Sequence, residues 1–122
     1  MFKRSVPLLV LAAVSTAFCA TDAEELMQKR CAVCHMTSNP TAEKVKHMVA
    51  PPMWGVVRHL KREIGSKDEF VAFVSDYIMN PSEGKIRFNR EAFERFGLMP
   101  SMKGSISEKE AKEIAEYLYS IY

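Results

Sequence analysis

Hydrophobic and polar residues follow a helical pattern in the second half of the chain. Between residues 67 and 80, one face of the predicted helix carries Phe70, Val71, Val74, Tyr77 and Ile78. Pro81 ends this helix, because a proline disfavours the helical conformation of the residue before it. A last helix is predicted over residues 107–120, where Ser107 and Glu110 form a capping box. Its apolar stripe consists of Ala111, Ile114, Ala115, Leu118 and Ile121.

Weaker patterns fill the rest of the chain. Residues 22–30 predict a short helix that opens with acidic and closes with basic residues, as the helix dipole favours. Residues 37–50 are expected to form a loop, and residues 87–96 a short helix that ends at Gly97. No segment shows the alternation of a strand, so we expect an all-α domain of short helices and long loops. About 100 residues of this kind form a modest core, so another group is expected at the centre.

The first residues have the layout of a secretory signal peptide. Two basic residues precede an uncharged run over residues 6–17. This run is shorter than the roughly 20 residues of a membrane-spanning helix, although a retained anchor is one alternative. The small residues Ala17 and Cys19 favour cleavage after Cys19, whereas a lipoprotein would be acylated there. We therefore expect residues 1–19 to be removed, leaving one domain over residues 20–122 with no stable membrane span.

The charge of the chain is nearly balanced. It contains 17 lysines and arginines against 15 aspartates and glutamates, a formal net charge of +2. Loss of residues 1–19 would remove Lys3 and Arg4 and bring this charge to 0. A domain without basic excess is not typical of proteins that bind nucleic acid or acidic membranes.

Cys31, Ala32, Val33, Cys34 and His35 form the C-x-x-C-H pattern of haem c attachment. The two cysteines are three residues apart and share one face of a helical turn, where both thiols can form thioethers with porphyrin vinyl groups. His35 projects from the same turn and can reach the iron. A thioredoxin-like pair would need a βαβ framework, and a zinc site would need two further ligands. Haem attachment is therefore the favoured interpretation.

Over residues 22–122 the chain resembles the class I c-type cytochromes, a family of small monohaem proteins. Besides the C-x-x-C-H motif, the segments APPMWGVV and YIMNP are similar to the family's G-P-x-L-x-G segment and Tyr-x-x-Asn-Pro helix end. A methionine also precedes the final helix. The resemblance implies a cytochrome c-like fold wrapped around one covalently attached haem and its iron. The chain departs from compact members in the extra segment FNREAFERFG, for which partner docking is one interpretation.

The resemblance also implies the iron ligands. His35 is the proximal ligand, and Met99, which lies between a glycine and a proline, is the distal one. Met102 is the runner-up in the same loop, and His47, His59 or an open position are further alternatives. Histidine–methionine ligation raises the reduction potential relative to bis-histidine ligation and leaves no open position on the iron. An open position would allow ligand binding.

Three further positions are expected near the haem: Pro51 and Tyr77 from the same resemblance, and Trp54 as the only tryptophan of the chain. The carbonyl of Pro51, or of the adjacent Pro52, would accept a hydrogen bond from Nδ1 of His35 and orient the ring. Trp54 would line the pocket or donate its N–H to a propionate. Tyr77 would form a hydrogen bond near the axial sulfur. Ordinary packing is the alternative for Trp54 and Tyr77.

These features predict a monohaem electron carrier, not an enzyme, in the periplasm of a Gram-negative bacterium. The expected partners are those of a respiratory chain: a quinol–cytochrome c reductase, a terminal oxidase, or a periplasmic dehydrogenase or reductase. Two alternatives stay open. One is a haem-based sensor or enzyme for a small ligand, and the other is a haem subunit of a larger oxidoreductase.

Overall fold

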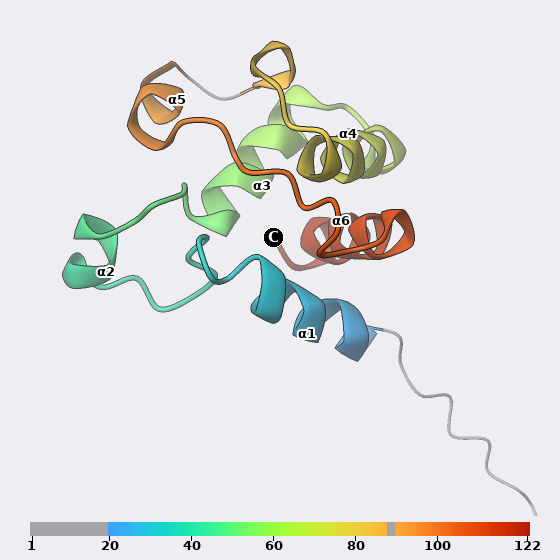
Figure 1. Ribbon diagram of the computed structural model, residues 1–122, viewed down its shortest axis with the longest axis horizontal. Helices are drawn as coiled ribbons and strands as arrows, with labels where there is room; N and C mark the ends of the chain where they lie inside the picture. The colour runs from blue at the N-terminus through green and yellow to red at the C-terminus, as the bar shows by residue number, and fades with distance from the viewer. Residues whose placement is uncertain (1–19, 88–89) are drawn as a thin grey trace, which may run out of the picture.

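The computed structural model describes residues 20–87 and 90–122, so the expected signal peptide lies outside the described residues. The described helices are α1 (Ala20–Arg30), α2 (Ala42–Lys46), α3 (Met53–Glu63), α4 (Lys67–Met79), the 3₁₀ helix η1 (Glu83–Lys85), α5 (Arg90–Phe96) and α6 (Glu108–Ile121) (Figure 1). These residues contain no strand, so the all-α prediction is confirmed. Within them, no helix is both long and apolar enough to span a bilayer.

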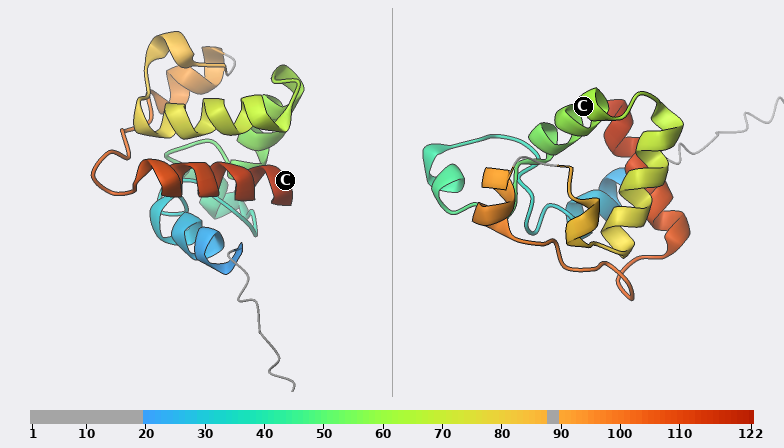
Figure 2. Two further views of the ribbon diagram at one scale, coloured as in Figure 1. Left: turned by 90° about the vertical axis from the view of Figure 1, so that its right-hand side faces the viewer. Right: turned by 90° about the horizontal axis from the view of Figure 1, so that it is seen from above.

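The core is built mainly from α1, α4 and α6, with α6 lying between α4 and α1 (Figure 2). Helix α3 adds Met53, Val57 and Leu60 to the same core. Phe70 of α4 is fully buried, and its ring meets the Tyr119 ring of α6 edge-on at a centroid distance of 5.1 Å. Ala111 and Ala115 of α6 are also fully buried, and such small side chains allow close approach of neighbouring helices. Burial of these apolar faces provides most of the stability of the fold.

The predicted faces of the two long helices agree with the structure, with one exception. All five expected positions of α4 are buried, and so are the first four of α6. Ile121 is 42% exposed, because it lies in the last turn of α6 at the end of the chain, and its predicted burial was wrong. The capping box is confirmed: Ser107 Oγ accepts from the amide of Glu110, whose Oε1 accepts from the amide of Ser107.

Two connecting segments differ from the prediction. The expected loop over residues 37–50 contains α2, whose first turn is capped by the Thr41 hydroxyl. None of its residues is buried, so no apolar periodicity could reveal it. The short helix expected over residues 87–96 is described from Arg90 onwards as α5, and it ends at Gly97 with a positive φ of 73°. Glycine adopts this conformation without steric cost.

α2 and α5 lie to one side of the core, on the left of Figure 1. Neither contains a buried residue. The guanidinium of Arg95 in α5 donates to the carbonyl oxygen of Val45 in α2 at 3.4 Å. This side of the molecule therefore depends on something other than the core for its packing.

Candidate functional site

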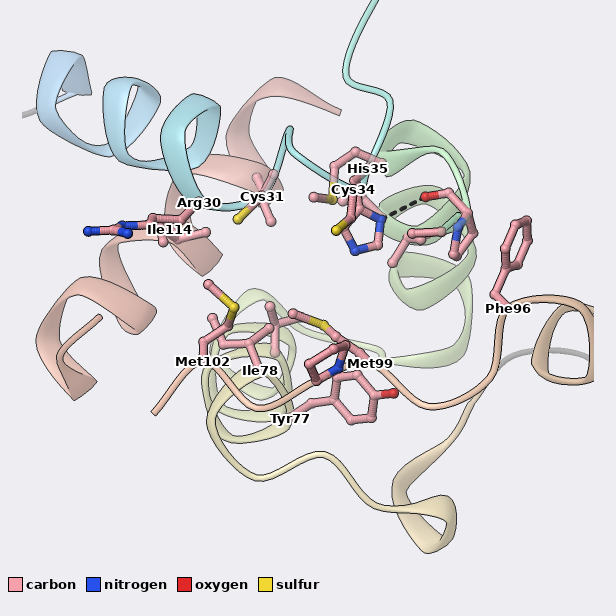
Figure 3. Close-up of a pocket in the computed structure, with 18 of the residues that line it drawn as sticks. Arg30, Cys31, Cys34, His35, Tyr77, Ile78, Phe96, Met99, Met102 and Ile114 are labelled. Carbon is pink, nitrogen blue, oxygen red and sulfur yellow. Dashed lines mark hydrogen bonds between the residues drawn. The ribbon is translucent and has the colours of Figure 1, made fainter. Parts of the chain in front are cut away.

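The C-x-x-C-H residues lie on a helical turn that continues α1. The amide of Cys31 donates to the carbonyl of Met27 at 2.8 Å, and the amides of Cys34 and His35 donate to the carbonyl of Cys31 at 3.1 and 2.9 Å. Figure 3 shows the three side chains on one side of a cavity. Burial, with a smaller contribution from Cys34, raises the pKa of the Cys31 thiol to about 11, so this thiol is protonated at neutral pH.

His35 is oriented by a hydrogen bond from its Nδ1 to the carbonyl oxygen of Pro51, at 2.7 Å (Figure 3). Because a carbonyl oxygen only accepts, Nδ1 carries the hydrogen and Nε2 keeps a lone pair for a metal. Burial lowers the pKa of His35 and outweighs the opposing effect of the Pro51 carbonyl. A neutral imidazole with its Nε2 available is the form that binds iron. The structure places Pro51, not Pro52, in this contact.

The segment that follows His35 is held at two further points. The amide of Met53, at the start of α3, donates to the carbonyl of Met36 at 2.9 Å. The hydroxyl of Tyr122, the last residue, donates to the carbonyl of Thr37 at 2.8 Å. The turn bearing His35 is thus fixed between α3 and the C-terminal end of the chain.

The cavity beside this turn has a volume of about 600 Å³, within the roughly 300–1,000 Å³ of ligand and cofactor sites. Its walls are largely apolar and include Met53, Val57, Leu60, Phe70, Val74, Ile114 and Leu118. The charged side chains among its lining residues are all basic: Lys29, Arg30 and Lys85. Lys29 is paired with Glu25, and Lys85 with Asp76. An apolar cavity with basic groups suits the hydrophobic ring and anionic propionates of a haem.

Met99 and Met102 reach the cavity from the side opposite His35 (Figure 3). Their loop is attached to the end of α4. The amide of Met102 donates to the carbonyl of Ile78 at 2.9 Å, and the hydroxyl of Ser101 donates to the carbonyl of Met79 at 2.6 Å. The last carbonyls of a helix lack hydrogen-bond donors within the helix, and this loop supplies donors for two of them. The loop therefore presents two thioethers to the same cavity.

Of the other two predicted pocket residues, the structure brings one to the cavity. Tyr77 is buried, lines the cavity and stacks on Phe73 with ring centroids 5.9 Å apart. Burial raises the pKa of Tyr77, while a hydrogen bond with the backbone of Met99 opposes this shift. Trp54 is half-buried on α3 but is not among the lining residues, since α3 turns Met53 towards the cavity instead. The predicted pocket role of Trp54 therefore lacks a structural basis.

The two histidines considered as alternative ligands are not brought to the cavity. His47 lies on the exposed surface with its Nε2 2.9 Å from a carboxylate oxygen of Glu43. His59 contacts the carbonyl oxygen of Arg87. The described residues also contain no group of three or more His, Cys, Asp and Glu side chains that could hold a metal ion.

Sequence reasoning missed two aromatic residues of the site. Phe93 and Phe96 of α5 line the cavity, although their segment was interpreted as a docking surface. Their spacing of three residues within a charged segment was the available signal, because it places both rings on one helical face. The sequence alone does not show which part of the molecule this helical face packs against.

The chemistry of the donor set fits a haem. Two thiols lie on one turn, an imidazole presents a free Nε2, and two thioethers stand across an apolar cavity. Cys31 and Cys34 would hold the porphyrin edge, His35 would bind the iron, and a methionine would complete its coordination.

Comparisons with known proteins agree with this fit. The model of the family described as "Cytochrome C oxidase, cbb3-type, subunit III" matches residues 19–118. An uncharacterized protein of Aquifex aeolicus (strain VF5) is 34% identical over 110 residues, which cover 80% of this chain and 72% of that protein. No solved structure is significantly similar to the chain. The chain therefore belongs to the c-type cytochromes of the cbb3-type subunit III family and carries covalently bound haem c with its iron.

Proposed function

We propose that this protein is a monohaem electron carrier in which Cys31 and Cys34 form the thioethers, His35 is the proximal iron ligand and Met99 is the distal ligand. The observation that carries the proposal is the cavity itself, with the free Nε2 of His35 on one side and thioethers on the other. When bound, haem c supplies one-electron oxidation and reduction of its iron. The protein contributes two strong ligands, which leave no position for a substrate.

Two observations favour Met99 over Met102. In Figure 3, Met99 lies across the cavity from His35, whereas Met102 lies further along it, towards Ile114. The side chain of Tyr77, which lines the cavity, also forms a hydrogen bond with the backbone of Met99 and thereby holds this residue at the cavity.

The surroundings of the iron favour electron transfer over ligand sensing. The apolar lining excludes water, which stabilises ferrous iron and raises the reduction potential. Met99 as sixth ligand acts in the same direction. A sensor or enzyme would instead need an open or easily opened coordination position.

We further propose that residues 1–19 are a cleaved signal peptide and that the mature domain acts in the periplasm of a Gram-negative bacterium. The family match begins at residue 19, directly after the basic residues and the apolar run typical of a signal peptide, which supports this boundary. The intact mass of protein produced with haem-attachment machinery should correspond to a chain from Ala20 with one haem. A mass without haem would contradict the proposal, and a longer chain would contradict only the cleavage.

The partners belong to the same proposal. A quinol–cytochrome c reductase, a terminal oxidase, or a periplasmic dehydrogenase or reductase would exchange electrons with a shuttle. The description of the matching family favours a second candidate, a haem subunit of an oxidase. Gentle purification from native cells separates the two, because a shuttle elutes alone and a subunit elutes with its complex.

A further inference from the structure

α5 presents an apolar face to the cavity and a charged face to solvent. Phe93 and Phe96 are half-buried and line the cavity, whereas Glu94 and Arg95 between them are exposed. Neither phenylalanine belongs to the hydrophobic core or to the partly buried residues packed against it. The two rings therefore line the cofactor cavity without being part of the hydrophobic core.

The described contacts of α5 do not bury this face. A helix of seven residues is not stable by itself, so its apolar side must be covered. The guanidinium of Arg95 reaches Val45 and lies 4.8 Å from the centroid of the Phe96 ring, but Arg95 is itself exposed. Both phenylalanine rings remain only half-buried where they line the cavity, so the occupant of the cavity is the group that would cover them.

The position of Phe96 shows which edge of the cavity α5 lies along. Figure 3 places Phe96 at the end of the view that is nearer His35 than Ile114, beyond the hydrogen-bond partner of His35, and the chain then runs to Met99 on the opposite side. The segment from α5 to Met99 thus crosses one edge of the cavity, from the proximal to the distal side.

We propose that Phe93 and Phe96 form an aromatic wall that closes this edge of the haem cavity to water and thereby raises the reduction potential. The proposal rests on the proposed function, because it takes haem as the occupant. An apolar cover lowers the local dielectric constant and disfavours the additional positive charge of ferric iron. A docking role for these phenylalanines would instead require them to point outwards. The outward face of α5 carries the charged residues Glu94 and Arg95.

The test is a potentiometric titration of the holoprotein carrying Phe93→Ala and Phe96→Ala together. We expect about a tenfold lower equilibrium constant for reduction, which is about 59 mV for one electron, with the haem bands retained. Val45→Ala is the matched control, because Val45 is an exposed apolar residue of neighbouring α2 that does not line the cavity. The control should leave the potential unchanged.

An unchanged potential in the double variant would overturn the aromatic wall. Phe93→Leu with Phe96→Leu should restore most of the potential, because leucine also excludes water. If the double alanine variant does not accumulate, the two single alanine variants give the same test with smaller shifts. Failure of the proposed function itself is distinguishable, since reduced wild-type protein with an open coordination position would bind carbon monoxide before any substitution.

Discussion

The Nδ1 atom of His35 lies 2.7 Å from the carbonyl oxygen of Pro51, sixteen residues further along the chain. This hydrogen bond joins the turn after α1 to the start of α3 and selects the tautomer in which Nε2 is free. Burial keeps the pKa of His35 low, so the ring enters the site uncharged. The contact with Pro51 therefore fixes the orientation and the tautomer of the proposed proximal ligand, and burial favours its uncharged form.

Replacing Met99 by alanine should lower the reduction potential and open the iron to carbon monoxide, because the thioether that favours ferrous iron is lost. Met102→Ala is the matched control, since Met102 lies in the same loop and lines the same cavity. The iron of the Met102→Ala variant should remain six-coordinate. Redox titration and carbon monoxide binding to the reduced proteins measure both effects. The reverse pattern would assign Met102 as the ligand.

Single substitution of Cys31 or Cys34 by serine should leave haem attached through one thioether, with one vinyl group unreacted. The free vinyl extends conjugation, so the α band of the reduced haem should move to longer wavelength. Substitution of both cysteines should release the haem on a denaturing gel. Ala32→Ser, between the two cysteines, serves as the control and should leave the spectrum as it is. A wild-type spectrum in either cysteine variant would reject the two-thioether attachment.

Phe70→Ala should reduce the free energy of unfolding by about 3–5 kcal/mol, because it empties the fully buried centre between α4 and α6. Guanidinium denaturation of the oxidised holoprotein measures the loss. Lys112→Ala, on the exposed side of α6, should stay within about 0.5 kcal/mol of wild type. A loss as small as that of the control would show that Phe70 does not occupy the core.

The ion pair between Asp76 and Lys85 should contribute a small, pH-dependent stability. The pKa of Asp76 is lowered chiefly by its hydrogen bond with Lys85 and then by that with Asn80. A carboxyl group with a lower pKa in the folded state stabilises it above the unfolded pKa of about 4, and this contribution disappears as the pH falls through the folded pKa. Asp76→Asn should therefore be less stable than wild type at neutral pH and equal to it in strong acid. A difference in stability between Asp76→Asn and wild type that persists in strong acid would show that the ion pair is not its source.

The sequence specified the parts of the molecule that depend on local chemistry. The inward face of α4, the capping box at Ser107 and the C-x-x-C-H turn each follow from spacing along one helix or turn. The lining of the cavity depends instead on the path of distant segments. That path leaves Trp54 out of the lining and brings Phe93 and Phe96 into it. The spacing of the two phenylalanines indicates a shared helical face, but it does not indicate what that face packs against. The same holds for the distal ligand: because Met99 and Met102 lie in one loop, the choice between them depends on how the loop is placed over the cavity.

The most direct test of the account is the absorption spectrum of the purified mature protein, first oxidised and then reduced. The account predicts sharp α and β bands on reduction and a weak far-red band in the oxidised form, which Met99→Ala removes and Met102→Ala retains. Haem bands without the far-red band would contradict histidine–methionine ligation. A protein with no haem bands, produced in a host with intact attachment machinery, would contradict the central claim.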